Sequence, residues 1–172
     1  ILPIGEKVII RAFGFLNRLM ELGYNDIGIS VNVSVIQLLD PDFTSRLLGL
    51  AGDMRIDPRH VGIEITESVF SSDFDRINKI IEKLKRAGFQ VAIDDVGTGY
   101  SSLTRQKELH VDCMKIDKYF IDKLLYTAPE KAITSDIISM AHKLGHCTVA
   151  EGVEEEIQMR YLKEHNCDKV QG

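Results

Sequence analysis

The sequence predicts an α/β fold in which parallel strands alternate with helices. Strand-like apolar runs recur along the chain, and segments with apolar residues at three- and four-residue spacing separate them. This alternation is typical of parallel βα units. Each strand-like run also carries a polar, chemically capable residue at or near its carboxyl end. That arrangement is the mark of a (β/α)8-type barrel, whose active site lies at the carboxyl ends of the strands.

The strands are predicted from short apolar or alternating runs, because side chains spaced by two residues share one face of a strand. The six candidates are residues 27–32, 61–67, 91–95, 111–117, 147–154 and 168–172. A complete barrel of this type needs about 250 residues. Six strands in 172 residues therefore predict a barrel that is incomplete at its N-terminal side.

Four helical patterns separate these strands. Their apolar residues recur at helical spacing in residues 43–50, 74–84, 133–144 and 157–162. Gly88 and Gly145 follow the second and third patterns, where a glycine commonly ends a helix. Acidic residues at 154–156 precede the fourth, where negative charge favours a helix N-terminus.

Composition excludes several functional classes. Net charge is −5, so we do not expect a DNA- or RNA-binding surface, and no apolar run reaches transmembrane length. The three cysteines lack CxxC spacing, which argues against a zinc site and favours buried, reduced thiols. The hydrophobic content of 44% is ordinary for a globular domain.

The most informative segment is the strand candidate that ends in Asp94 and Asp95. Two adjacent carboxylates repel each other unless a cation lies nearby, and hard divalent metals such as Mg²⁺ and Mn²⁺ prefer oxygen ligands. A Gly-x-Gly turn at 97–99 follows at once. A plain turn is the alternative, because Asp and Gly are also common turn residues.

The chain resembles the EAL-domain phosphodiesterases of cyclic di-GMP signalling along essentially its whole length. The matching segments, in the order of the family, are SVNVS (30–34), EITES (64–68), DDVGTGYSS (94–102), MKID (114–117), AEGVE (150–154) and QG (171–172). The resemblance implies a modified TIM barrel with one antiparallel strand. It also implies hydrolysis of cyclic di-GMP to linear pGpG with two divalent ions, Mg²⁺ or Mn²⁺. The Glu-Ala-Leu signature of the family, whose glutamate is a metal ligand, is missing from these 172 residues.

The resemblance also assigns roles. Lys115 and Glu151 are the expected catalytic residues, and Glu67 is expected to hold the loop at 96–102 in place. Gln171 and Glu154 are expected to face the substrate, whereas Asp117 is either a site acid or a helix cap. The expected metal ligands are Asn32, Glu64, Asp94, Asp95 and Glu151.

We expect residues 1–172 to form a single EAL-type domain of a longer, bacterial, multidomain protein, with little activity on its own. The resemblance further implies a homodimer and a cytoplasmic location, and it leaves open an attached GGDEF or sensory domain and a membrane anchor on the parent. The alternative function is a catalytically inactive EAL domain that binds cyclic di-GMP as a receptor. Degenerate receptors typically lose ligand acids, whereas the ligand positions within this chain are intact.

Overall fold

The structure is a computed structural model that describes residues 2–71, 73–96, 107–126 and 132–172. It contains two compact units, Ile1–Val91 and Ala92–Gly172. Within each unit the strands are parallel and follow one another in chain order. The α/β class and the parallel strands predicted from the sequence are therefore confirmed.

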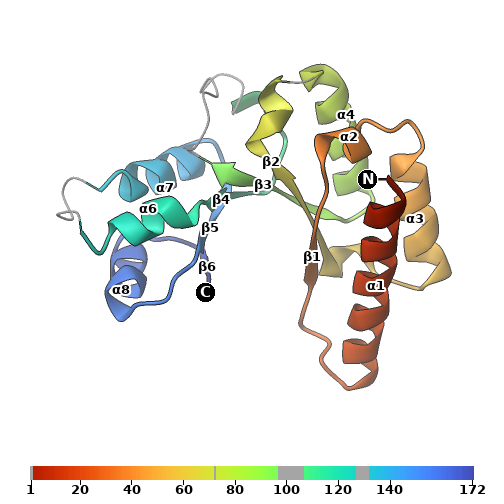
Figure 1. The fold of residues 1–172 in the computed structure, drawn as a ribbon, viewed down its shortest axis with the longest axis horizontal. Coiled ribbons are helices and arrows are strands. Elements are labelled where there is room, and N and C mark those ends of the chain that lie inside the picture. Colours follow the sequence, from red (N-terminus) through yellow and green to blue (C-terminus); the bar gives the residue numbers. More distant parts are fainter. Residues whose placement is uncertain (1, 72, 97–106, 127–131) are drawn as a thin grey trace. The chain divides into compact units, whose positions relative to one another are not determined.

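The first unit pairs two parallel strands with four α-helices (Figure 1). Its elements are α1 (Leu2–Glu21), β1 (Ile29–Asn32), α2 (Val35–Leu38), α3 (Phe43–Asp53), the 3-10 helix η1 (Pro58–His60), β2 (Val61–Thr66), the 3-10 helix η2 (Glu67–Ser71) and α4 (Phe74–Arg86). Strand β3 (Gln90–Val96) begins in this unit and continues into the next.

In the second unit, helices α6, α7 and α8 lie to one side of β4–β6 in the view of Figure 1. Its elements after β3 are β4 (Cys113–Ile116), α6 (Lys118–Lys123), α7 (Thr134–Lys143), β5 (Cys147–Glu151), α8 (Glu156–Glu164) and β6 (Lys169–Gln171). All six predicted strands and all four predicted helices are present. No described helix has both the length and the apolar composition that crossing a membrane requires.

Helix α4 illustrates why the predicted helices form where they do. Ile77, Ile81 and Leu84 recur on one face and are fully buried. The Asp73 side chain accepts a hydrogen bond from the backbone N–H of Arg76 and so caps the first turn. Gly88 then takes φ +101°, a conformation that glycine adopts without strain, and the chain leaves the helix.

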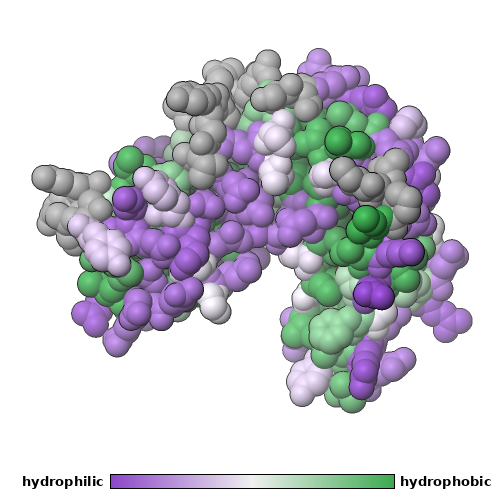
Figure 2. All heavy atoms as spheres, viewed as in Figure 1, coloured by the Kyte–Doolittle hydropathy of each residue, from purple (hydrophilic) through white to green (hydrophobic). Residues whose placement is uncertain are grey.

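The sequence gives a weaker signal for α1. Ile9, Phe13 and Leu16 form its buried face, but Ile4 and Phe15 on the same helix are exposed. Apolar residues on both sides blur the one-sided pattern by which an amphipathic helix is recognised. Figure 2 accordingly shows apolar side chains on the visible surface of this first helix.

One expectation about the cysteines is wrong. Cys113 and Cys147 form a disulfide that links β4 to β5, while Cys167 is a free thiol. The two bonded residues are direct register partners on adjacent parallel strands, with Cα atoms 4.4 Å apart. Register, which the linear spacing does not reveal, brings them within the separation that a disulfide spans.

A hydrogen-bonded group holds the beginnings of β5 and β6 together. Asp168 Oδ2 accepts hydrogen bonds from the Thr148 backbone N–H at 2.7 Å and from its hydroxyl at 2.9 Å. His142 Nε2 lies 2.8 Å from the same oxygen. Burial alone would raise the pKa of Asp168, but the hydrogen bonds from His142 and Thr148 outweigh it, so the pKa lies below its ordinary value.

We predict that Asp168→Asn lowers the free energy of unfolding by about 1 kcal/mol at pH 7, a value kept small because the carboxylate is partly exposed. A lowered folded-state pKa gives stability that is present above about pH 4 and is lost as the pH falls further. Denaturant unfolding of both proteins from pH 7 to pH 3 should show their difference shrinking in acid. Glu164→Gln is the matched control, and a difference that persists unchanged at pH 3 contradicts the assignment.

Candidate active site

A β-bulge places Asp94 and Asp95 at the same site. Ile93 pairs with Met114 and Val96 pairs with Ile116, so the two aspartates together lie opposite one residue of β4, Lys115. Adjacent side chains in a regular strand point to opposite faces. Asp95 instead takes φ +59°, in the left-handed region that aspartate tolerates better than most residues. Oxygen atoms of both carboxylates and of Glu151 lie within 4.8 Å of one another.

Lys115 balances this negative charge from the end of β4. Its ammonium lies 2.5 Å from Glu151 Oε1 and 3.4 Å from Asp94 Oδ1, and its side chain is only 5% exposed. A buried ammonium is unfavourable unless it is paired, and these two carboxylates pair it. Strands β3, β4 and β5 thus each contribute charged groups to one cluster, which we call the carboxylate cluster: Asp94, Asp95, Lys115 and Glu151.

Asp117 lies beside this cluster and is a helix cap. Its carboxylate accepts a hydrogen bond from the Tyr119 backbone N–H at 2.7 Å and thereby begins α6. Burial raises the pKa of Asp95 above its ordinary value, and Asp94, Asp117 and Glu151 raise it further. The sequence left open whether Asp117 is a helix cap or a site acid. In the structure it caps α6 and also lies next to Asp95 of the cluster.

In the first unit, Asn32 and Glu64 are neighbours near the carboxyl ends of β1 and β2. They are register partners in the parallel ladder. The backbone N–H of Val33 donates to the Glu64 carbonyl at 2.8 Å, so the pairing continues past the end of β1. Asn32 is thus the last residue of β1, and Glu64 lies two residues before the end of β2.

The other three predicted site residues are Glu67, Glu154 and Gln171. Glu67 begins η2 just after β2 ends, and most of the loop it was expected to hold, residues 97–102, lies outside the described residues. Gln171 is the register partner of Glu151. Glu154 lies three residues beyond Glu151 and pairs with Lys118 at 3.1 Å.

Sequence reasoning missed two residues that contact this region, Lys118 and Gln158. Lys118 directly follows the MKID segment, and its charge alone does not distinguish it from other surface lysines. Gln158 had a recognisable signal, because an acid followed three residues later by Gln or Glu is the spacing of a capping box. Glu155 and Gln158 form such a box at the start of α8.

The carboxylate cluster has donors suited to a hard divalent cation. Mg²⁺ and Mn²⁺ take carboxylate oxygens as ligands, and Asp94, Asp95 and Glu151 offer three such groups within reach of one ion. A bound cation would also relieve the repulsion that raises the pKa of Asp95. These residues therefore fit a divalent metal site.

The family model described as EAL domain matches the chain over residues 1–172. A curated relative, the bifunctional diguanylate cyclase/cyclic di-GMP phosphodiesterase MucR of Pseudomonas aeruginosa, is 35% identical over 172 residues. The alignment covers 100% of this chain and 25% of MucR. The chain therefore spans only a quarter of that relative's length.

Solved structures agree with this family match. The structure of the PaMucR phosphodiesterase in complex with c-di-GMP superposes with a TM-score of 0.91 at 34% identity, covering 99% of this chain and 69% of that one. The Klebsiella pneumoniae BlrP1 manganese/cyclic di-GMP complex has a TM-score of 0.84 at 26% identity and covers 99% of this chain and 43% of that one. The predicted fold, part of a TIM-barrel-like EAL domain, is confirmed.

We predict that Lys115→Met lowers the free energy of unfolding by about 3 kcal/mol, because it leaves the cluster carboxylates without their buried cation. Adding Mn²⁺ should then raise the melting temperature of the variant more than that of the wild type, since the metal replaces the lost positive charge. Thermal unfolding with and without Mn²⁺ measures both effects.

Lys163→Met on the exposed part of α8 is the matched control, because it removes the same charge at a distance from the cluster. Equal stability and equal Mn²⁺ response in Lys115→Met and Lys163→Met would contradict the role of Lys115.

Proposed function

The chain belongs to the EAL domain family, and we propose that it hydrolyses cyclic di-GMP to linear pGpG with two divalent ions, Mg²⁺ or Mn²⁺. Water adds across one phosphodiester linkage: the water oxygen bonds to phosphorus, the P–O3′ bond breaks, and the 3′ oxygen takes a proton. The observation that carries the proposal is the carboxylate cluster, in which three acids and a buried lysine meet.

We assign Asp94, Asp95 and Glu151 of the carboxylate cluster to metal binding. Asn32 and Glu64, which belong to the first unit, keep the role that the resemblance implies, as ligands of the first of the two ions. Bound divalent ions acidify a coordinated water and stabilise charge that develops on the phosphate. The use of a divalent ion is supported by a relative, since the BlrP1 structure contains manganese together with cyclic di-GMP.

Lys115 and Glu151 have complementary roles in the proposed reaction. The ammonium of Lys115 can donate a hydrogen bond to a phosphate oxygen or to the attacking water, where charge-assisted bonds are strongest. Glu151 can accept a hydrogen bond from that water and so orient it toward phosphorus. Glu67 is proposed to support the loop that follows β3, while Asp117, Glu154 and Gln171 are proposed to contact the substrate.

The surroundings of the domain are also part of the proposal. We expect a homodimer, a cytoplasmic location and further domains, GGDEF or sensory, on the parent protein. MucR supports the last point, because its name combines diguanylate cyclase with phosphodiesterase and the chain matches only 25% of it.

A cyclic di-GMP receptor without catalysis is the second candidate function. The two functions differ in what Glu151 contributes. In an enzyme, Glu151 acts on the water, so its effect is concentrated in the transition state. In a receptor, the wild type binds without turnover.

We predict that Glu151→Gln in the full-length protein lowers kcat by about a hundredfold or more while cyclic di-GMP binding changes little. Release of pGpG and calorimetric binding should be measured side by side in Mg²⁺ and in Mn²⁺. Glu164→Gln on the exposed face of α8 is the charge-matched control and should behave like the wild type. Tight binding without any pGpG from the wild type in either metal would favour the receptor.

A further inference from the structure

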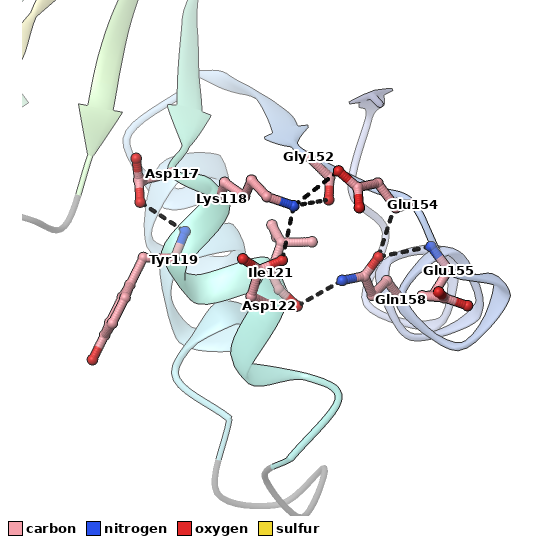
Figure 3. Close-up of polar contacts among 9 residues, drawn as sticks. All are labelled: Asp117, Lys118, Tyr119, Ile121, Asp122, Gly152, Glu154, Glu155 and Gln158. Carbon is pink, nitrogen blue, oxygen red and sulfur yellow. Dashed lines mark hydrogen bonds and ion pairs between the residues drawn. The ribbon is translucent and has the colours of Figure 1, made fainter.

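Lys118 links the start of α6 to the segment that follows β5 (Figure 3). Its Nζ lies 3.1 Å from Glu154 Oε1, 3.0 Å from Asp122 Oδ1 and 3.4 Å from the Gly152 carbonyl oxygen. Glu154 and Gly152 belong to the turn that begins immediately after Glu151, the last residue of β5. A single ammonium therefore contacts both the backbone and a side chain of the turn next to a cluster acid.

The aliphatic part of Lys118 packs on the turn as closely as its charge does. Gly152 has φ +66°, a left-handed conformation that lets the chain turn sharply after Glu151. A Cβ at this position would lie only 2.5 Å from Lys118 Cγ. Two features therefore favour glycine at position 152. Its backbone has a positive φ, and the Lys118 side chain lies too close to leave room for a Cβ.

Gln158 fixes the other side of the same turn. Its Oε1 accepts hydrogen bonds from the backbone N–H groups of Glu154 and Glu155, each at 2.9 Å. Its Nε2 donates to the Ile121 carbonyl in α6 at 3.2 Å, and the residue is only 1% exposed. A carboxamide suits this place because it carries a neutral acceptor and a neutral donor on two separate atoms. The turn is therefore held against α6 from two directions.

Helix α6 is in turn fixed to the end of β4. Asp117 caps it, and Lys115 lies two residues before that cap. The contacts of Lys118 thus connect the strand that carries Lys115 with the turn that follows Glu151. Hydrogen bonds to Asp122 and Glu154 also raise the pKa of Lys118, so it keeps its charge well above neutral pH.

We propose that Lys118 is a positioning residue for the hydrolysis of cyclic di-GMP. It holds the turn at Gly152 so that Glu151 stays aligned with Lys115 and Glu154 stays at its place beside the site. The inference rests on the proposed function. It assigns no chemical step to Lys118, whose ammonium contacts neither the cluster carboxylates nor Lys115 among the interactions found in the described part of the chain.

The test is Lys118→Met in the full-length protein, because methionine keeps an unbranched apolar stem over Gly152 and removes the ammonium with its charge and its hydrogen-bond donors. Lys118 is about half exposed, with 46% of its side chain accessible, so the variant should fold. We expect kcat to fall about tenfold, the scale of losses when a group that orients a metal ligand is removed, with a smaller change in KM. Lys118→Arg should restore most of the activity, because it restores a cation at the same position.

Hydrogen exchange supplies a readout that does not depend on activity. Amides of residues 152–155 should exchange faster in Lys118→Met than in the wild type, because the turn loses its contact with Lys118 and keeps only those with Gln158 and Gln171 among the hydrogen bonds found in the described residues. Lys163→Met removes an equal charge from exposed α8 and should change neither exchange in this segment nor kcat.

The outcomes separate the inference from the proposed function. If the wild type hydrolyses cyclic di-GMP and Lys118→Met retains its kcat, the positioning role is overturned while the function stands. If the wild type has no turnover, the proposed function fails, and hydrogen exchange in Lys118→Met then tests the positioning role by itself. Faster exchange confined to residues 152–155 supports that role, and unchanged exchange overturns it.

Discussion

Concentrated negative charge at the carboxyl ends of β3 and β5 is the constraint on which the second unit depends. Oxygen atoms of Asp94, Asp95 and Glu151 lie within 4.8 Å of one another, so their negative charges repel and a nearby cation stabilises the arrangement. Lys115 supplies one from β4, and the donor set suits a divalent ion as another. The bulge in β3, the cap at Asp117 and the turn at Gly152 all serve this cluster, because each fixes the backbone next to one of its members.

The elements that the sequence predicts well are those whose apolar residues lie on one face only. Helix α4 has a buried stripe, a capping aspartate and a terminal glycine, and the sequence predicts it with nearly correct bounds. Helix α1 exposes Ile4 and Phe15 and escaped prediction. The Cys113–Cys147 disulfide escaped for another reason, since the pairing of two residues separated by 34 positions depends on strand register, which a linear sequence does not state.

The candidate site follows the same division. Positions at or near the carboxyl ends of strands could be predicted for Asn32, Glu64, Asp94 and Glu151 from the motifs and from the rule that parallel strands carry their functional residues at one end. The left-handed conformation of Asp95 could not be predicted, because it accompanies the β-bulge in which two residues of β3 lie opposite one residue of β4. The contacts of Lys118 and Gln158 join three elements in space and have only a weak local signature. What sequence predicts well is therefore which groups meet, and what it predicts poorly is what holds them there.

The most direct test of this account is anomalous diffraction at the manganese edge from crystals of the full-length protein grown with Mn²⁺ and without substrate. The account predicts a manganese peak within coordination distance, about 2.2 Å, of oxygen atoms from Asp94, Asp95 and Glu151. Ordered density for these three carboxylates with no manganese peak between them, at a concentration that saturates binding in solution, would contradict it.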